Sequence, residues 1–352
     1  MYPTNNISKP LLHWYKNSKR SMPWRNTKNP YNIWLSETML QQTQVKTVIP
    51  FYNRWIEQFP DFESVARAHL DSLLMIWEGL GYYNRCKNFH KAVKTIVKKY
   101  NSSLPVNIED FKALPGVGIY TAAAVYSIAF SHSIPVLDGN VKRVMSRFLR
   151  ICQLTSHNKN RILSKLDTWI DRNYPGDFNQ AMMELGSTVC LPKNPKCNIC
   201  PLISSCGGFS SGKPQSYPRS QRQNPIPWHP VLTGVVWKRN SFLILQREGY
   251  RHLSNLWELP GGKILKNYNS KNQLMKMLKK KYNLDVSIIN KIGDVRHRYS
   301  HFGIYLSSFN CKIKNGSTPM VNQPYCWINK HEINRFAFPK ANHKLFAIML
   351  EN

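Results

Sequence analysis

Four cysteines near the middle of the chain are the strongest sign of chemistry in this sequence. Cys190, Cys197, Cys200 and Cys206 are separated by six, two and five residues. Four thiolates from one short loop can hold a structural zinc ion or an iron–sulfur cluster. The paired CxxC elements of zinc fingers usually stand about a dozen or more residues apart, so this spacing favours iron–sulfur. Disulfides are disfavoured, because a long enzyme-like chain without a recognisable signal peptide is expected in the reducing cytoplasm.

Two acidic residues in unlike surroundings form a second chemical pattern. Glu37 is flanked by apolar residues in the stretch 34–40. Burial there would raise the pKa of its carboxyl, although a position on a solvated helix face is the alternative. Asp138 follows the apolar stretch 134–137 where a helix is expected to begin, and it could serve there only as an N-cap. A proton donor and a second carboxylate that stabilises a cationic sugar are what cleavage of a glycosidic bond requires.

A glycine-containing turn is a third pattern. Leu114-Pro115-Gly116-Val117-Gly118 leads directly into an apolar run that begins at Ile119. Glycines at the start of a helix let backbone N–H groups approach a phosphate at the positive end of the helix dipole. The pattern is typical of a helix–hairpin–helix element, which grips the DNA backbone at Gly116 and Gly118 without reading sequence. A plain turn between two helices is the alternative.

The composition narrows the class of partner. The chain has 352 residues, with 49 Lys and Arg against 19 Asp and Glu, a formal charge of +30. Such an excess indicates a polyanionic partner, and no apolar run reaches the roughly 18 residues that span a bilayer. The basic charge, the phosphate-binding turn, the cysteine loop and the two carboxyls together predict a DNA base glycosylase.

The spacing of apolar residues and the local composition divide the chain into two parts. Residues 1–206 carry apolar residues at helical spacing, so we expect an all-α catalytic domain that includes the cysteine loop. Residues 207–229 are rich in Gly, Ser, Pro, Gln and Arg and are interpreted as a linker. Residues 230–352 contain strand-like runs at 231–246, 286–292 and 304–312 around one helical stretch, 273–282, which indicates an α+β domain.

The chain resembles the MutY-type adenine DNA glycosylases, members of the helix–hairpin–helix iron–sulfur glycosylase superfamily, over nearly its full length. The segments that carry the resemblance are 23–25, 29–31, 34–45, 79–83, 114–118, 137–144, 178–186 and the cysteine loop. The hairpin and cysteine loop are also similar to those of endonuclease III-like enzymes, whereas Leu40-Gln41-Gln42-Thr43-Gln44 and the position of Glu37 favour the adenine enzymes. The resemblance implies a two-lobed helical domain with a 4Fe–4S cluster. It also implies a monomer that excises adenine opposite 8-oxoguanine or guanine from double-stranded DNA.

The resemblance also implies roles for single residues. Glu37 would protonate the adenine ring and then assist the attack of water, and Asp138 would stabilise the sugar cation with help from Asn140. Tyr120 matches a residue that supports Asp138 and the departing base. Arg25 and Glu184 match residues that line the adenine pocket of the family. Gln42 and Tyr82 match residues that are inserted into the base stack near the lesion. Arg20 departs from the family pattern, and the chemistry is expected not to depend on it.

The C-terminal part resembles the Nudix-like module of the same family. Gly261-Gly262 stands where a Nudix enzyme begins its metal-binding box, which needs several Glu on the next helix. No Asp or Glu lies between Glu258 and Asp285, so nucleotide hydrolysis is not expected. The segment Tyr299-Ser300-His301 is similar to the Phe-Ser-His loop that contacts 8-oxoguanine in the family, with tyrosine in the phenylalanine position. A surface β-turn is the alternative.

Two other functions compete with adenine excision. An endonuclease III-like lyase would need a catalytic lysine two residues after the last glycine of the hairpin, where this chain has Tyr120. A non-enzymatic iron–sulfur protein that binds DNA would have no use for Glu37 and Asp138. The sequence therefore favours a monofunctional glycosylase.

Overall fold

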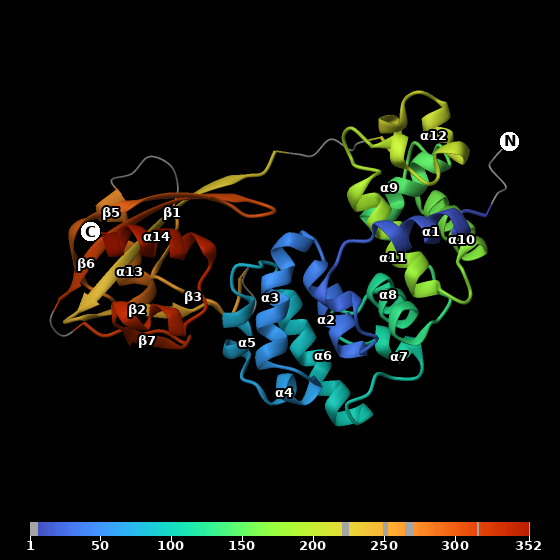
Figure 1. Cartoon of the computed structure of the whole chain (residues 1–352). Coiled ribbons are helices and arrows are strands. Elements are labelled where there is room, and N and C mark those ends of the chain that lie inside the picture. The colour runs from blue at the N-terminus through green and yellow to red at the C-terminus, as the bar shows by residue number, and fades with distance from the viewer. Residues whose placement is uncertain (1–5, 220–224, 249–252, 265–269, 315–316, 352) are drawn as a thin grey trace. The chain divides into compact units, whose positions relative to one another are not determined.

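The computed structural model describes residues 6–219, 225–248, 253–264, 270–314 and 317–351. The chain forms two compact units. The first consists of Met1–Arg67 and Lys87–Arg222, and the second of Ala68–Cys86 and Gln223–Asn352 (Figure 1).

The first unit is helical, as expected. Its helices are α1 (Ser8–Ser18), α2 (Pro30–Leu40), α3 (Val45–Gln58), α4 (Phe62–Arg67), α6 (Asn84–Tyr100), α7 (Ile108–Lys112), α8 (Ile119–Phe130), α9 (Gly139–Phe148), α10 (Ser156–Trp169), α11 (Pro175–Thr188) and α12 (Gly207–Ser210). A buried core joins α1, α8, α9, α10 and α11. In Figure 1 these helices, α8 excepted, lie together with α12 in one lobe, and α2, α3, α4, α6 and α7 lie in the other.

Local sequence explains where the helices next to the cavity begin. The Asn29 side chain caps α2 by accepting a hydrogen bond from the Tyr31 amide, and Pro30 occupies the first turn. Helix α8 follows Gly118 and is buried along Thr121–Ser127, because its residues are apolar or small on all sides. The Asp138 side chain caps α9 by accepting from the Val141 amide at 2.7 Å. The two side-chain caps and the Gly118 turn set the starts of three helices whose residues line one cavity.

The segment after the cysteine loop is more ordered than a linker. Residues Gly207–Ser210 form α12, and Pro214–Ser216 form a short 3-10 helix. Both elements pack against α9. Gly208 permits this packing, because a Cβ atom on it would lie 2.7 Å from the Arg147 carbonyl oxygen.

The second unit is built on one sheet. Its strands are β1 (Trp228–Lys238), β2 (Ser241–Gln246), β3 (Trp257–Glu258), β4 (Gly261–Lys263), β5 (Val286–Arg298), β6 (Gly303–Ile313) and β7 (Tyr325–Ile328). The central order is β3-β2-β1-β6-β5, with β1 and β6 parallel and the other pairs antiparallel. Side chains alternate between the faces, so α13 (Ser270–Tyr282) packs on one face and α14 (Lys340–Glu351) on the other.

The helix α5 (Leu70–Trp77) and the turn after it belong to the second unit. The Glu78 carboxylate accepts hydrogen bonds from the Phe338 amide and lies 2.7 Å from His343 Nε2. Gln246 donates to Asp71 at 3.3 Å. Polar contacts thus hold residues 71–78 to the start of α14 and the end of β2.

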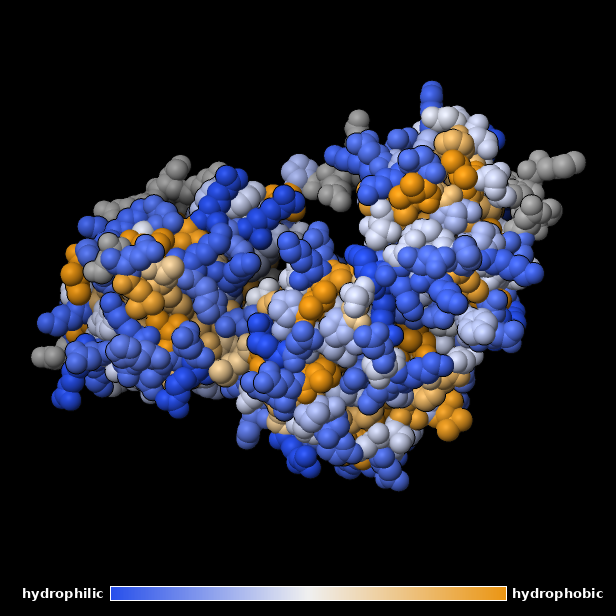
Figure 2. Space-filling view, in the orientation of Figure 1, coloured by the Kyte–Doolittle hydropathy of each residue, from blue (hydrophilic) through white to orange (hydrophobic). Residues whose placement is uncertain are grey.

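The fold class expected from the sequence is confirmed: a helical domain is followed by an α+β domain. No helix among the described residues is long and apolar enough to cross a membrane. Hydrophilic side chains cover much of the visible surface of each unit, with hydrophobic residues in separate patches (Figure 2).

Candidate active site and cysteine loop

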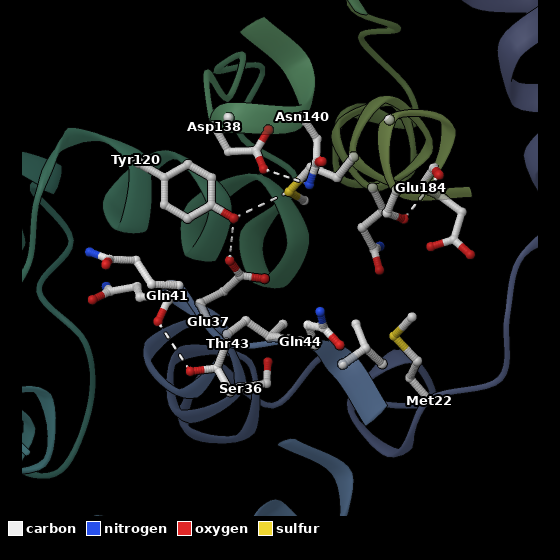
Figure 3. A pocket seen from close by; sticks show the side chains of 18 of the residues that line it. Met22, Ser36, Glu37, Gln41, Thr43, Gln44, Tyr120, Asp138, Asn140 and Glu184 are labelled. Atoms are coloured by element: carbon white, nitrogen blue, oxygen red, sulfur yellow. Dashed lines mark hydrogen bonds between the residues drawn. The ribbon is translucent and has the colours of Figure 1, made fainter. Parts of the chain in front are cut away.

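The first unit contains a cavity of about 990 Å³. Nine residues singled out from the sequence line it: Arg25, Glu37, Gln42, Gly116, Gly118, Tyr120, Asp138, Asn140 and Glu184. Figure 3 shows α2 presenting Glu37 from one side, while Tyr120 and Asp138 approach from the opposite side. The fold therefore brings together residues that lie far apart in the sequence.

With Glu184, Glu37 is one of two buried acids that line this cavity. It is 5% exposed, and burial raises the pKa of its carboxyl to about 7. The Tyr120 hydroxyl donates a 2.6 Å hydrogen bond to Glu37 Oε2, which acts in the opposite direction on this pKa, and the nearby Asp138 charge raises it further. A carboxyl with this pKa can both give and take a proton near neutral pH.

Asp138 is held by the start of α9. One carboxylate oxygen accepts from the Val141 amide, and the other accepts from Asn140 Nδ2 at 3.0 Å (Figure 3). The Asn140 side-chain oxygen in turn accepts from Arg143 at 2.8 Å. Asp138 is thus both the helix cap that the sequence allowed and a carboxylate that lines the cavity.

Two contacts between α9 and the end of α11 fix the position of Asn140. A Cβ atom on Gly186 would lie 2.5 Å from the Asn140 Cβ atom and 3.1 Å from its backbone, so only glycine allows this approach. Arg143 also donates to the carbonyl oxygens of Gly186 at 2.7 Å and Cys190 at 2.8 Å. The same guanidinium therefore links the carboxylate end of the cavity to the first residue of the cysteine loop.

Glu184 is only 1% exposed and carries two arginine partners. Arg20 binds its carboxylate through Nε and Nη2 at 2.6 and 2.9 Å, and Arg25 binds it at 2.7 Å. Burial raises the pKa of Glu184, but the hydrogen bonds from the two arginines outweigh burial and hold this pKa below its usual value. The side of the cavity near Glu184 therefore presents an ionised carboxylate and two cationic donors.

The hairpin between α7 and α8 has the backbone that its glycines predict. Gly116 has a left-handed φ of +79°, and the neighbouring Gly118 has open space where a Cβ would stand. Gln42 also lines the cavity, and it adopts a left-handed φ of 58° although it is not glycine. Such a conformation is uncommon for a residue other than glycine.

The four cysteines of the loop surround a second, small cavity. The Arg147 side chain lines it as well and donates to Cys190 Sγ at 3.2 Å and to the Leu191 carbonyl oxygen. Four soft thiols at one cavity are a donor set that suits an iron–sulfur cluster. Within the described residues, no three Cys, His, Asp or Glu side chains already stand together as a metal-binding group.

The remaining expected residues lie in the second unit. Ser300 Oγ donates a 2.6 Å hydrogen bond to the Tyr82 hydroxyl, so the structure joins two residues that the sequence had placed in separate motifs. Tyr82 has a left-handed φ of 52°, and Arg85 stacks on its ring and donates to the Gly81 carbonyl oxygen. Tyr299 packs between His297 and Phe302, whereas Ser300 and His301 are exposed.

The structure also shows site residues that the sequence reasoning had missed. Arg20 binds Glu184 through two nitrogens, a contact that the sequence did not indicate. Arg143 and Arg147 organise the space between the cavity and the cysteine loop. Their spacing of four residues just after Asp138 places both on one side of α9 and could have indicated a shared task.

Family models match both parts of the chain. Residues 35–170 match the HhH-GPD superfamily of base excision DNA repair proteins, and residues 232–347 match the NUDIX domain. The adenine DNA glycosylase of Buchnera aphidicola subsp. Schizaphis graminum is 36% identical over 354 residues, which cover 97% of this chain and 98% of the relative. The human adenine DNA glycosylase is 30% identical over 398 residues, covering 96% of this chain and 73% of the relative.

Solved structures resemble the helical part. A thermostable thymine-DNA glycosylase superposes with a TM-score of 0.54 at 25% identity, covering 58% of this chain and 95% of that one. An endonuclease III–DNA complex superposes with a TM-score of 0.51 at 24% identity, covering 60% of this chain and 99% of that one. The second likeness shows a shared fold.

Proposed function

Because the chain belongs to the adenine DNA glycosylase family and is a DNA glycosylase of base excision repair, we propose that it removes adenine mispaired with 8-oxoguanine or guanine. The bond broken is the N-glycosidic bond, in double-stranded DNA. The observation that carries the proposal is Glu37, a buried carboxyl with a pKa of about 7 in a cavity wide enough for a base.

Glu37 is the proton donor in the proposed reaction. Its protonated form gives a proton to a ring nitrogen of adenine, so the base leaves as a neutral molecule. The carboxylate that results accepts a proton from the attacking water. The Tyr120 hydroxyl stays bonded to Glu37 Oε2 and holds the carboxyl in one orientation.

Asp138 faces the positive charge that develops on the sugar as the base departs. A carboxylate stabilises an oxocarbenium-like transition state or captures the sugar on one face. The Val141 amide and Asn140 hold the two oxygens of Asp138 in place before the reaction. Such preorganised charge lowers the barrier, because nothing has to reorient during the reaction.

We assign Arg25 and Glu184 to the adenine pocket and Gln42 and Tyr82 to the residues that enter the base stack. Arg25 donates to Glu184, and both line the cavity with Glu37. Extrusion of a base leaves a gap in the duplex, which the side chains of Gln42 and Tyr82 would fill. Gly116 and Gly118 are assigned to the DNA backbone.

The domains divide the work in this proposal. Residues 1–206 carry catalysis, residues 230–352 recognise 8-oxoguanine through Tyr299, Ser300 and His301, and residues 207–229 connect them. Cys190, Cys197, Cys200 and Cys206 would hold one 4Fe–4S cluster, which would fix the loop that Arg143 and Arg147 contact. The enzyme would act as a monomer in the cytoplasm.

Adenine release from defined duplexes tests the proposed function. Single-turnover assays would compare adenine opposite 8-oxoguanine, adenine opposite guanine, adenine opposite thymine and an oxidised pyrimidine. We expect release from the first two alone. Release only from the oxidised pyrimidine would refute the proposal.

Iron analysis tests the cluster independently of activity. We expect about four iron atoms per chain in the purified protein. Cys200→Ser should lose iron, whereas Cys152→Ser and Cys326→Ser, which lie outside the loop, should keep it. Stoichiometric zinc without iron would contradict the assignment.

A further inference from the structure

The face of the sheet beside residues 299–302 carries an arginine that is packed against aromatic rings. The Arg296 guanidinium carbon lies 4.5 Å from the centre of the Trp228 ring and 5.7 Å from that of Tyr305. The two rings are themselves 4.9 Å apart. Stacking holds a guanidinium in one orientation, so less side-chain entropy is lost when its N–H donors bind a ligand.

The strand register places a second arginine on the same face. Arg296 pairs with Tyr305, and Arg298 pairs with Gly303, which is also the partner of Trp228. Because side chains alternate along a strand, Arg296 and Arg298 project from one face about 7 Å apart. Gly303 makes room for the indole, since a Cβ atom there would lie 2.4 Å from the ring of Trp228.

The charge of these arginines is available to a ligand. Both side chains are exposed, and among the described residues neither forms an ion pair with a carboxylate. Asp294, two residues before Arg296, already accepts hydrogen bonds from Lys291 and Ser307, each at 2.6 Å. An anion outside the unit is therefore the partner that fits this face.

We propose that Arg296 and Arg298 bind backbone phosphates of the DNA strand whose base is read by residues 299–301. The proposal rests on the recognition role assigned to Tyr299, Ser300 and His301. A chain charge of +30 favours DNA over a protein partner, and arginine forks match the geometry of phosphate oxygens. Contacts of this kind orient the protein on the duplex and carry no sequence information.

Salt-dependent binding tests the proposal. Dissociation constants would be measured for Arg296→Gln and Arg298→Gln in the full chain, on a Glu37→Gln background that leaves the adenine attached to the DNA. We expect the slope of log K against log salt to fall by about one for each arginine removed. The loss of affinity should be the same for duplexes with adenine opposite 8-oxoguanine, guanine or thymine.

Three further variants separate a built phosphate site from general charge. Trp228→Leu should weaken DNA binding about as much as Arg296→Gln does. The double variant should bind little more weakly than Arg296→Gln alone, because the ring acts through the arginine. Arg296→Lys keeps the charge, so the slope should persist although affinity falls. Arg239→Gln, at the exposed β1–β2 turn, is the matched control and should lower the slope less than either site variant.

Two outcomes would overturn the proposal. One is a slope that stays the same in both Arg296→Gln and Arg298→Gln, which would also be the result if this face served a protein partner. The other is a loss confined to the 8-oxoguanine duplex, which would make these arginines base readers. Failure of the proposed function is a separate result, because it appears as missing adenine release in the protein without substitutions.

Discussion

The hydroxyl of Tyr120, at the start of α8, donates a 2.6 Å hydrogen bond to Oε2 of Glu37, in the last turns of α2. Burial raises the pKa of both groups, that of Glu37 to about 7 and that of Tyr120 well above its usual value. The phenol therefore remains a donor throughout the range in which Glu37 titrates. Only the carboxyl changes charge near neutral pH.

The rate of excision should follow the protonation of Glu37. The acid works when it holds a proton, so single-turnover excision should be constant below pH 7 and fall about tenfold per pH unit above it. Glu37→Gln has nearly the same shape without the acidic proton, and should slow excision by about two to four orders of magnitude. Its binding to the mispair should persist. A Glu37→Gln enzyme that keeps more than about a tenth of the rate would contradict the assignment.

The same substitution should stabilise the fold. The pKa of Glu37 rises from 4.5 to about 7 on folding, so the folded protein binds this proton more tightly than the unfolded chain. Stability from this group is complete below pH 4.5 and is lost as pH rises to about 7, by about 3 kcal/mol. In urea unfolding of the helical unit, the free energy of unfolding of Glu37→Gln should therefore rise relative to that of the unsubstituted protein between pH 5 and 8. Parallel pH profiles would disprove this.

Gly186→Ala should damage the site through α9. The added methyl would meet the Asn140 Cβ atom at 2.5 Å and push apart the helices that hold Asp138. We expect a loss of about 1–3 kcal/mol in the free energy of unfolding and slower excision. Gly139→Ala is the matched control, because a methyl there meets nothing within 4 Å. Equal unfolding free energies for the two variants would contradict this prediction, because they would mean that α9 and α11 can move apart at no cost in stability.

Much of this architecture was readable from sequence because it is encoded locally. The apolar run that begins at Ile119 predicts the start of α8, and the strand-like run 231–246 corresponds to β1 and β2. Arg20 could not be assigned, because its partner Glu184 is 164 residues away and only tertiary folding joins them. The polar composition of residues 207–229 predicts a linker, yet packing against α9 orders the part at 207–216.

The hydrogen bond between Ser300 and Tyr82 should contribute to lesion preference. Ser300→Ala removes the donor and Tyr82→Phe removes the acceptor, so each should lower the preference for 8-oxoguanine over guanine opposite adenine. The double variant should lose little more than either single one, since one interaction is lost in all three. The measurement is the ratio of single-turnover rates on the two duplexes. Fully additive losses would show that the residues act separately.

The enzyme should stop after it releases adenine. A lyase needs an amine that attacks the sugar carbon and forms a Schiff base, and Tyr120 stands where bifunctional relatives are expected to carry that lysine. A phenol cannot form this adduct, and the Tyr120 hydroxyl is instead hydrogen-bonded to Glu37. Lys142 lines the same cavity, so a faint crosslink to an opened abasic sugar after borohydride treatment is compatible with this prediction.

Strand cleavage without alkali or heat, followed alongside adenine release, measures this directly. We expect free adenine to accumulate while the strand stays intact until alkali is added. Lys142→Gln is the informative companion, because it should abolish the faint crosslink and leave the rate of adenine release nearly unchanged. Nicks that accumulate at the same rate as free adenine would show that an amine in the cavity attacks the sugar, and the monofunctional assignment would then fail.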